Sequence, residues 1–220
     1  MRKYRADLGV CLDGDGDRLT VVDRNGEVIH GDRLIGLCGK FLKDNHELGS
    51  TNEVVGTVMS NFGLEQYLQK NGLKFIRTAV GDRYIVEHMR TSGAVFGGEP
   101  SGHLVFKRYS TTGDGILAAL KVIESIKFYD RDLSELTNEI ELFPQKMENV
   151  LVAKRVPFEE VPAITKALEV AQEKLKNEGR ILLRYSGTEA LARVMVEGRD
   201  EKLVSSICSE VAAVVLKALG

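Results

Sequence analysis

The sequence lacks a strong imbalance of charge. Its 220 residues include 30 lysines and arginines and 32 aspartates and glutamates, which gives a formal net charge of -2 at pH 7. No run of basic residues interrupts this balance, whereas proteins that bind nucleic acid or anionic membranes usually carry such a run. We therefore expect no nucleic-acid partner and no membrane partner.

Long hydrophobic runs and closely spaced cysteines are also absent. No apolar stretch approaches the roughly 20 residues of a membrane-spanning helix, and the first residues lack the apolar core of a secretion signal. Cys11, Cys38 and Cys208 are far apart and form no CxxC pair, so we expect them to be small buried hydrophobes in a reducing compartment. These features favour a cytoplasmic globular protein.

An acidic loop is the most distinctive feature that is present. Asp13, Asp15 and Asp17 alternate with glycines, and alternating apolar residues on both sides predict one strand before the loop and one after it. Three carboxylates this close repel one another unless a cation lies among them. Their oxygens suit a hard divalent ion, which favours a magnesium site, with Arg18 placed where the negative charge of a substrate arrives.

A hairpin turn and a calcium loop are two other interpretations of this stretch. Asp-Gly pairs are common in hairpin turns, and that alternative stays open. A calcium loop of the EF-hand type needs glycine at its sixth position and glutamate at its twelfth. Counted from Asp13, these positions hold Arg18 and Arg24, which excludes the EF-hand.

Strand and helix patterns alternate between residues 31 and 143. A helix with one apolar face begins at Gly31, and Asp32 is its expected N-cap. Further strands are expected at 54–59, 75–80, 94–96 and 103–106, and further helices at 64–69, 82–90, 115–128 and 133–142. This alternation predicts an α/β fold in which helices cover a mixed sheet.

Residues 144–220 follow a different pattern, which predicts a smaller α+β domain. Strands are expected at 148–154, 180–184 and 192–197, and helices at 161–177 and 203–219. Gly179 is the expected C-cap of the first helix. The second helix has an apolar stripe that we assign to the core, formed by Leu203, Ile207, Val211, Val214 and Ala218.

A glycine-rich loop, Gly-Gly-Glu-Pro-Ser-Gly-His at residues 97–103, connects two predicted strands. Glycines let a ligand approach the backbone, and Glu99, Ser101 and His103 offer hydrogen-bonding groups suited to the hydroxyls of a polyol such as a sugar. A turn in which Glu99 and Ser101 only cap nearby backbone groups fits equally well. At a predicted helix start, Asp82 is either a second polar candidate or an N-cap.

A third loop, Arg-Tyr-Ser-Gly-Thr-Glu at residues 184–189, lies between two other predicted strands, with Arg193 beyond it. Successive backbone N–H groups, two hydroxyls and two guanidinium groups make a cradle for an anion, and arginine binds phosphate oxygens in a bidentate way. The alternative is a Ser-Gly-Thr turn with solvated arginines. We favour a phosphate site.

In this order, the three loops resemble the α-D-phosphohexomutase superfamily, whose motifs are a magnesium loop DGDGDR, a sugar loop GExSGH and a phosphate loop RxSGTE. The chain is most similar to the bacterial phosphoglucosamine mutases, because residues 55–61, 80–84, 111–115, 142–145 and 193–198 also match them. The alternative branch is the phosphomannomutase/phosphoglucomutases, which share all three loop types.

The resemblance implies an activity and roles for the loop residues. The activity is interconversion of glucosamine 6-phosphate and glucosamine 1-phosphate, on the route to UDP-N-acetylglucosamine and peptidoglycan, through a phosphoserine and a glucosamine 1,6-bisphosphate intermediate. It implies that Mg²⁺ is held by Asp13, Asp15 and Asp17. Arg18 would neutralise developing charge and His103 would carry a proton. The hexosamine phosphate would contact Glu99, Ser101, Arg184, Ser186, Gly187, Thr188 and Arg193.

The chain also departs from the family pattern at two positions and lacks one family motif. Ala79 stands where relatives often carry lysine, and Ala190 where proline is frequent. The nucleophilic serine of the family lies in a Ser-His-Asn-Pro type loop, and the chain contains no Asn-Pro pair. We therefore expect the carboxy-terminal half of such an enzyme, with residues 1–30 ending domain two, 31–143 forming domain three and 144–220 forming domain four.

A half enzyme has three expected properties. The strand at residues 7–12 should leave an open apolar edge. The isolated chain should be inactive, and its partner should be either the amino-terminal half or a second copy of the chain. An intact enzyme with a different nucleophile, or a non-catalytic module that binds phosphosugar, are the alternatives.

Overall fold

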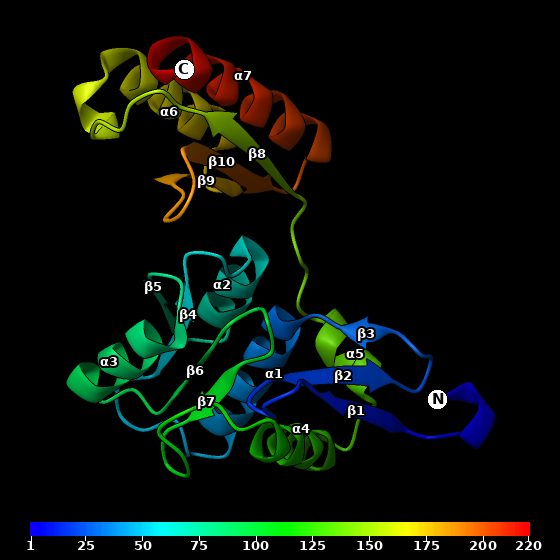
Figure 1. Cartoon of the computed structure of the whole chain (residues 1–220). Helices are drawn as coiled ribbons and strands as arrows, with labels where there is room; N and C mark the ends of the chain where they lie inside the picture. Colours follow the sequence, from blue (N-terminus) through cyan, green and yellow to red (C-terminus); the bar gives the residue numbers. More distant parts are fainter. The chain divides into compact units, whose positions relative to one another are not determined.

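The computed structural model describes residues 1–220, apart from the side chain of Arg2. The chain divides into two compact units, Met1–Glu141 and Leu142–Gly220, which are described separately (Figure 1). Within the described part of the chain, no helix combines the length and the apolar character needed to cross a membrane.

The first unit begins with a small antiparallel sheet that carries the acidic loop. Its strands are β1 (Leu8–Leu12), β2 (Leu19–Asp23) and β3 (Val28–Ile29), in the order β1-β2-β3. The turn between β2 and β3 forms because the Asp23 carboxylate accepts hydrogen bonds from the backbone N–H groups of Asn25 and Glu27. A short 3-10 helix, Arg2–Tyr4, precedes β1.

A second, mixed sheet of the first unit has the order β5-β4-β6-β7. Strand β4 (Glu53–Thr57) is parallel to both β5 (Lys74–Thr78) and β6 (Phe96–Gly98). Strand β7 (Leu104–Phe106) is antiparallel to β6. The helices of the unit are α1 (Gly31–Asp44), α2 (Phe62–Lys70), α3 (Asp82–Ser92), α4 (Gly115–Tyr129) and α5 (Leu133–Asn138).

Helix α1 lies at the centre of the first unit and contacts α2, α4 and α5. Its predicted apolar face is confirmed, since Leu34, Ile35, Cys38, Phe41 and Leu42 are all buried. The prediction of Asp32 as N-cap is wrong. The side chain of His30 accepts the hydrogen bond from the Asp32 N–H, which leaves the buried Asp32 carboxylate to accept from the Asn61 N–H at 2.9 Å.

The second unit is an antiparallel sheet with the order β8-β10-β9. Its strands are β8 (Gln145–Leu151), β9 (Gly179–Tyr185) and β10 (Leu191–Gly198), and its helices are the short 3-10 helix Phe158–Glu160, α6 (Pro162–Leu175) and α7 (Glu201–Leu219). Helix α7 packs on β8 and β10, and α6 packs on β9 and α7. The fold class is therefore confirmed as a mixed α/β unit followed by a smaller α+β unit.

Three details differ from the sequence predictions. Gly179 is not a C-cap, because α6 ends at Leu175 and Gly179 already begins β9. Helix α5 ends at Asn138 rather than at residue 142. In α7 the predicted stripe does contact the core, since Ile207 and Val211 are buried and Leu203, Val214 and Ala218 are partly buried against it. The fully buried stripe is wider than predicted and also contains Val204, Cys208, Ala212, Val215 and Leu219. The division into domains at residues 30 and 143 stays a prediction.

The three cysteines differ in burial, which corrects the expectation for Cys11. Cys38 and Cys208 are buried, as predicted, but Cys11 is exposed. Its cross-strand partner Thr20 on the central strand β2 is exposed as well, so Cys11 lies on the uncovered face of the sheet. Burial raises the pKa of the Cys38 thiol to about 12 and that of Cys208 to about 11.

This difference predicts how the thiols react. A thiolate is the reactive form, so at pH 8 we expect Ellman's reagent to modify Cys11 rapidly and the other two thiols only after unfolding. The measurement is a thiol count with and without denaturant, and Cys11→Ser should remove the rapid phase. A rapid phase that survives this substitution would contradict the assigned burial.

Candidate active site

The acidic loop is the connection between β1 and β2. Asp13, Asp15 and Asp17 each offer an oxygen, and these oxygens lie within 4.8 Å of one another. Asp13 and Asp15 are exposed and Asp17 is half-buried, so solvent or a ligand can reach the cluster. The number and type of donors fit Mg²⁺, which is usually bound by a few carboxylates together with water and phosphate oxygens.

Asp13 also shapes the loop. Its Oδ1 atom accepts hydrogen bonds from the backbone N–H groups of Gly16 at 3.1 Å and Arg18 at 3.2 Å. Burial acts to raise the pKa of Asp13, but these hydrogen bonds, a further one with Asp17 and the charge of Arg18 outweigh it and lower the pKa. The Arg18 Nε atom lies 3.7 Å from Asp13 Oδ2, and the guanidinium group is largely exposed. The loop therefore favours the ionised form of Asp13 before any cation binds.

The structure brings the glycine-rich loop of residues 97–103 directly onto the acidic loop. The Leu19 N–H donates a hydrogen bond to the Gly102 carbonyl at 3.0 Å, and Arg18 and His103 form an isolated antiparallel bridge. Gly102 has a φ of +89°, and a Cβ atom there would lie 2.1 Å from the Leu19 carbonyl oxygen. Glycine is therefore required at this position by both backbone conformation and close approach.

His103, the last residue of the glycine-rich loop, lies against the acidic loop, with only 3% of its surface exposed. The Gly113 N–H donates to Nε2 at 3.2 Å, so Nε2 is an acceptor and Nδ1 is assigned the proton. Nδ1 then donates to Asp17 Oδ2 at 3.1 Å. Sequence reasoning missed Gly113, because a backbone N–H is present in almost every residue and leaves no sequence signal.

Glu99 connects the glycine-rich loop to the start of α3. Its Oε1 atom accepts a hydrogen bond from the Gly81 N–H at 3.1 Å. Gly81, not Asp82, is the N-cap of α3, so the N-cap alternative for Asp82 is wrong. Asp82 Oδ2 lies 3.9 Å from His103 Nε2, close to the acidic loop, and Ser101 is exposed. The acidic loop, residues 97–103 and the start of α3 thus form one polar surface.

The predicted phosphate loop is the turn between β9 and β10 in the second unit. Arg184 and Arg193 are directly opposite each other in the antiparallel register, so their side chains lie on the same face. Gly187 and Thr188 are exposed at the tip, and the space beside Gly187 is open. This arrangement leaves the backbone of the turn accessible to a ligand.

The two arginines form a positively charged cradle. Burial and the neighbouring charge of Arg193 lower the pKa of Arg184. Arg193 Nη2 donates to Ser186 Oγ at 3.4 Å and to Glu189 Oε2 at 3.1 Å. Its Nε atom is buried without a hydrogen-bond partner among the described residues. An anion between the arginines would relieve their mutual repulsion and offer acceptors to their N–H groups.

Residues 155–158, which the sequence analysis did not identify, hold this turn in place. Arg155 Nη2 donates to the Ser186 carbonyl at 2.8 Å and also to the Glu189 carbonyl. The Tyr185 hydroxyl donates to the Val156 carbonyl at 2.7 Å, and its ring stacks on Phe158. These contacts fix both ends of the turn, so the cradle is formed before a ligand arrives.

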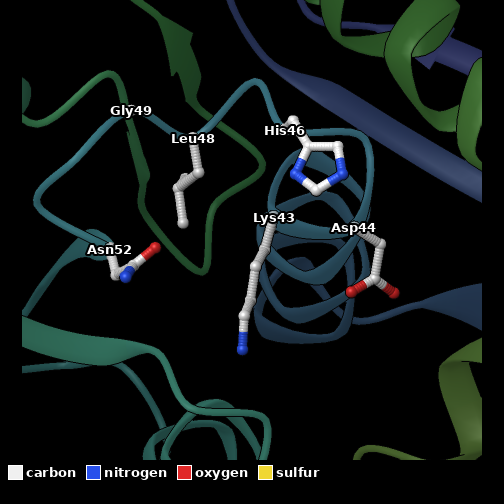
Figure 2. A pocket seen from close by; sticks show the side chains of 6 residues that line it. All are labelled: Lys43, Asp44, His46, Leu48, Gly49 and Asn52. Carbon is white, nitrogen blue, oxygen red and sulfur yellow. The ribbon is translucent and has the colours of Figure 1, made fainter.

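A separate surface pocket of about 590 Å³ lies at the end of α1 and is lined by Lys43, Asp44, His46, Leu48, Gly49 and Asn52 (Figure 2). Two of its charged groups are already paired. The Lys43 ammonium donates to the Asn71 carbonyl, and Asp44 accepts from Lys40 and from the Tyr129 hydroxyl. The pocket includes none of the predicted site residues.

The architecture belongs to the α/β proteins in which a mixed-sheet unit is followed by an α+β unit. Residues 30–143 match the family model described as phosphoglucomutase/phosphomannomutase, alpha/beta/alpha domain III, and residues 147–214 match the one described as phosphoglucomutase/phosphomannomutase, C-terminal domain. The chain therefore belongs to the phosphoglucomutase/phosphomannomutase family.

The curated relatives with similar sequences are phosphoglucosamine mutases, the branch of the family that the sequence motifs resemble. The chain is 51% identical over 219 residues to the phosphoglucosamine mutase of Desulfovibrio desulfuricans, which covers 100% of the chain and 48% of that relative. It is 50% identical over 214 residues to the phosphoglucosamine mutase of Solidesulfovibrio magneticus, covering 97% of the chain and 47% of the relative. The chain thus spans about half the length of the curated relatives it matches.

Solved structures support the fold. The N-acetylphosphoglucosamine mutase of Aspergillus fumigatus, in complex with GlcNAc-6P and magnesium, matches 96% of the chain and 49% of its own length with a TM-score of 0.76 at 20% identity. A phosphoglucomutase/phosphomannomutase family protein of Burkholderia thailandensis matches 97% of the chain and 47% of its own length with a TM-score of 0.73 at 23% identity.

Proposed function

We propose that this chain is part of a phosphosugar mutase that interconverts glucosamine 6-phosphate and glucosamine 1-phosphate. The observation that carries the proposal is the direct contact between the glycine-rich loop and the acidic loop, through the Leu19–Gly102 and Asp17–His103 hydrogen bonds. A sugar hydroxyl bound by the glycine-rich loop would then lie beside a cation held by the acidic loop. The names of the relatives at 51% and 50% identity support the choice of glucosamine.

The proposed roles follow from the side chains present. Asp13, Asp15 and Asp17 would hold Mg²⁺, which when bound supplies a positive charge that stabilises a transferring phosphoryl group. Arg18 lies exposed beside them and would neutralise charge that develops on the phosphoryl oxygens. The magnesium in the Aspergillus fumigatus complex supports this choice of ion.

The remaining site residues would bind the hexosamine phosphate. Glu99 and Ser101 would accept or donate hydrogen bonds to sugar hydroxyls, and His103 would act at the reacting end of the sugar as a proton carrier. In the second unit, the phosphate that is not transferring would contact Arg184, Ser186, Gly187, Thr188 and Arg193. The like charges of Arg184 and Arg193 and the unpaired Arg193 Nε atom support this assignment.

The reaction also needs a nucleophile, which we place on a serine outside this chain. The phosphoryl group would leave the serine oxygen for a sugar hydroxyl, giving glucosamine 1,6-bisphosphate, and after reorientation the other phosphate would return to the serine. The proposed setting is a cytoplasmic step toward UDP-N-acetylglucosamine and peptidoglycan. The proposed protein partner is the amino-terminal half of the enzyme, with a second copy of the chain as the alternative.

A second candidate is a phosphomannomutase/phosphoglucomutase, and the descriptions of both matched family models favour it. A third is a fragment that binds phosphosugar without catalysis.

An assay of the chain alone and after mixing tests the proposal. The reaction contains Mg²⁺, glucosamine 6-phosphate and catalytic glucosamine 1,6-bisphosphate, and the added partner is the half of the Desulfovibrio desulfuricans relative that the match does not cover. We expect glucosamine 1-phosphate only after mixing. Parallel assays with glucose and mannose phosphates decide between the first two candidates. Turnover by the chain alone would contradict the placement of the nucleophile.

A further inference from the structure

The segment of residues 111–115, which leads into α4, contacts both loops of the first unit. The Gly113 N–H donates a hydrogen bond to His103 Nε2, in the glycine-rich loop, at 3.2 Å. Two residues later, the Gly115 N–H donates to the Gly16 carbonyl, in the acidic loop, at 2.9 Å. A third part of the chain, outside all three motif loops, therefore links the proposed sugar loop to the proposed metal loop.

Both glycines of this segment are required by close approach. A Cβ atom at Gly113 would lie 2.4 Å from Cε1 and 2.5 Å from Nε2 of the His103 ring. A Cβ atom at Gly115 would lie 2.8 Å from the carbonyl oxygen of Gly16 and 3.0 Å from that of Arg18. Neither glycine has a positive φ, so packing rather than backbone conformation sets the requirement. A larger residue at either position would displace the ring or the loop that it touches.

The His103 ring connects Gly113 to a proposed metal ligand. Because Nε2 accepts from the Gly113 N–H, the ring proton is on Nδ1, which donates to Asp17 Oδ2 at 3.1 Å. The ring is buried and has Gly113 packed against it, which restricts its rotation. Groups that hydrogen-bond a metal-ligating carboxylate orient it, and their loss typically lowers metal affinity 10- to 100-fold.

We propose that Gly113 is a positioning residue for the metal site, which acts by holding the His103 ring in the tautomer and orientation that direct the Asp17 carboxylate toward the cation. The inference rests on the proposed function, from which it takes Mg²⁺ as the cation. This role of His103 is distinct from the proton transfer proposed above, which would require one of the two ring hydrogen bonds to open.

Gly113→Ala tests the inference, with Mn²⁺ binding to the whole chain followed by electron paramagnetic resonance. The added methyl group should push the ring away from Asp17 and lower Mn²⁺ affinity at least about 10-fold. Gly36→Ala is the matched control, because Gly36 is also a buried glycine of the first unit, and a Cβ atom there would lie 2.7 Å from Ile140 Cδ1. It should lower the melting temperature but leave Mn²⁺ affinity unchanged. An equal loss of affinity in both variants would overturn the inference.

Variants of His103 keep the inference testable if Gly113→Ala does not fold. Asparagine places an amide N–H near the position of Nδ1, so His103→Asn should keep the bond to Asp17 and most of the Mn²⁺ affinity. His103→Leu should lower it at least about 10-fold. Asparagine is too short to reach Gly113, so adding Gly113→Ala to His103→Asn should cost no further affinity. Equal affinities of the His103→Asn and His103→Leu chains, or a further loss in the double variant, would contradict the positioning role.

The ring ¹⁵N chemical shifts of His103 supply a measurement that a merely structural glycine would not change. The wild-type chain should carry the ring proton on Nδ1, and Gly113→Ala should disturb this preference. Asp82 Oδ2 lies 3.9 Å from Nε2 and is the alternative partner, so a proton on Nε2 in the wild-type chain would refute the inference. If the wild-type and Gly113→Ala chains bind Mn²⁺ equally, only the positioning role fails. If the wild-type chain binds no Mn²⁺, the metal site of the proposed function fails as well.

Discussion

Replacing Asp15 by asparagine should lower the affinity of the chain for divalent cations by at least about 100-fold, because loss of even an outer partner of a metal ligand typically costs 10- to 100-fold. Asp15 is the best choice in the acidic loop. Asp13 also holds the backbone of Gly16 and Arg18, and Asp17 bonds to His103, whereas no hydrogen bond of Asp15 is found among the described residues. Mn²⁺ binding followed by electron paramagnetic resonance, with Mg²⁺ as competitor, measures the loss.

Thermal unfolding separates loss of the metal from loss of the fold. Mg²⁺ should raise the melting temperature of the wild-type chain, because a ligand that binds only the folded state stabilises it, and this rise should vanish in Asp15→Asn. Without metal the variant should melt at the same or a higher temperature, since one of three repelling carboxylates has lost its charge. Asp130→Asn is the matched control, because Asp130 lies outside the cluster and asparagine tolerates its φ of +49°. Unchanged Mn²⁺ affinity in Asp15→Asn would refute the metal site.

Replacing Arg184 by glutamine should weaken binding of glucosamine 6-phosphate about 10- to 150-fold, the equivalent of about 1.5–3 kcal/mol for a hydrogen bond to a charged group. Arg184 is a cleaner target than Arg193, which also holds Ser186 and Glu189 in place. Titration calorimetry with the sugar phosphate measures the loss.

Stability again distinguishes binding from folding. Burial and the charge of Arg193 both disfavour the charged form of Arg184, so the glutamine variant should unfold at the same or a higher temperature. Lys166→Gln removes one positive charge from an exposed position of α6 in the same unit and should leave binding unchanged. Equal weakening in both variants would mean that net charge, rather than the cradle, attracts the phosphate.

Local patterns in the sequence were sufficient for the elements and for the composition of the loops. The apolar spacing of α1 predicts its buried face because a helix repeats every 3.6 residues, whatever packs against it. The alternating carboxylates of the acidic loop lie within a few residues of one another, so their convergence depends mainly on the local chain. The same is true of the Ser-Gly-Thr turn between β9 and β10.

Helix ends and burial were less predictable. Asp32 has the side chain of an N-cap, yet His30 occupies that role, because the buried Asp32 carboxylate is taken by the N–H of Asn61, a residue distant in the sequence. Cys11 lies in an apolar segment but is exposed, because it shares with Thr20 a face of the sheet that no other element covers among the described residues. Which face of a sheet is covered depends on packing by segments distant in the sequence.

The sequence by itself therefore determined which chemical groups each loop carries and which faces of most helices are apolar. Only the tertiary structure decided which groups meet. His103 hydrogen-bonds to Asp17 and to the Gly113 N–H, Glu99 accepts from the Gly81 N–H, and Arg155 donates to the Ser186 carbonyl. The physical reason is that these contacts join residues far apart in the chain, and most of them use backbone N–H or C=O groups. Nearly every residue carries such groups, so a contact made by one of them has no signature in the sequence.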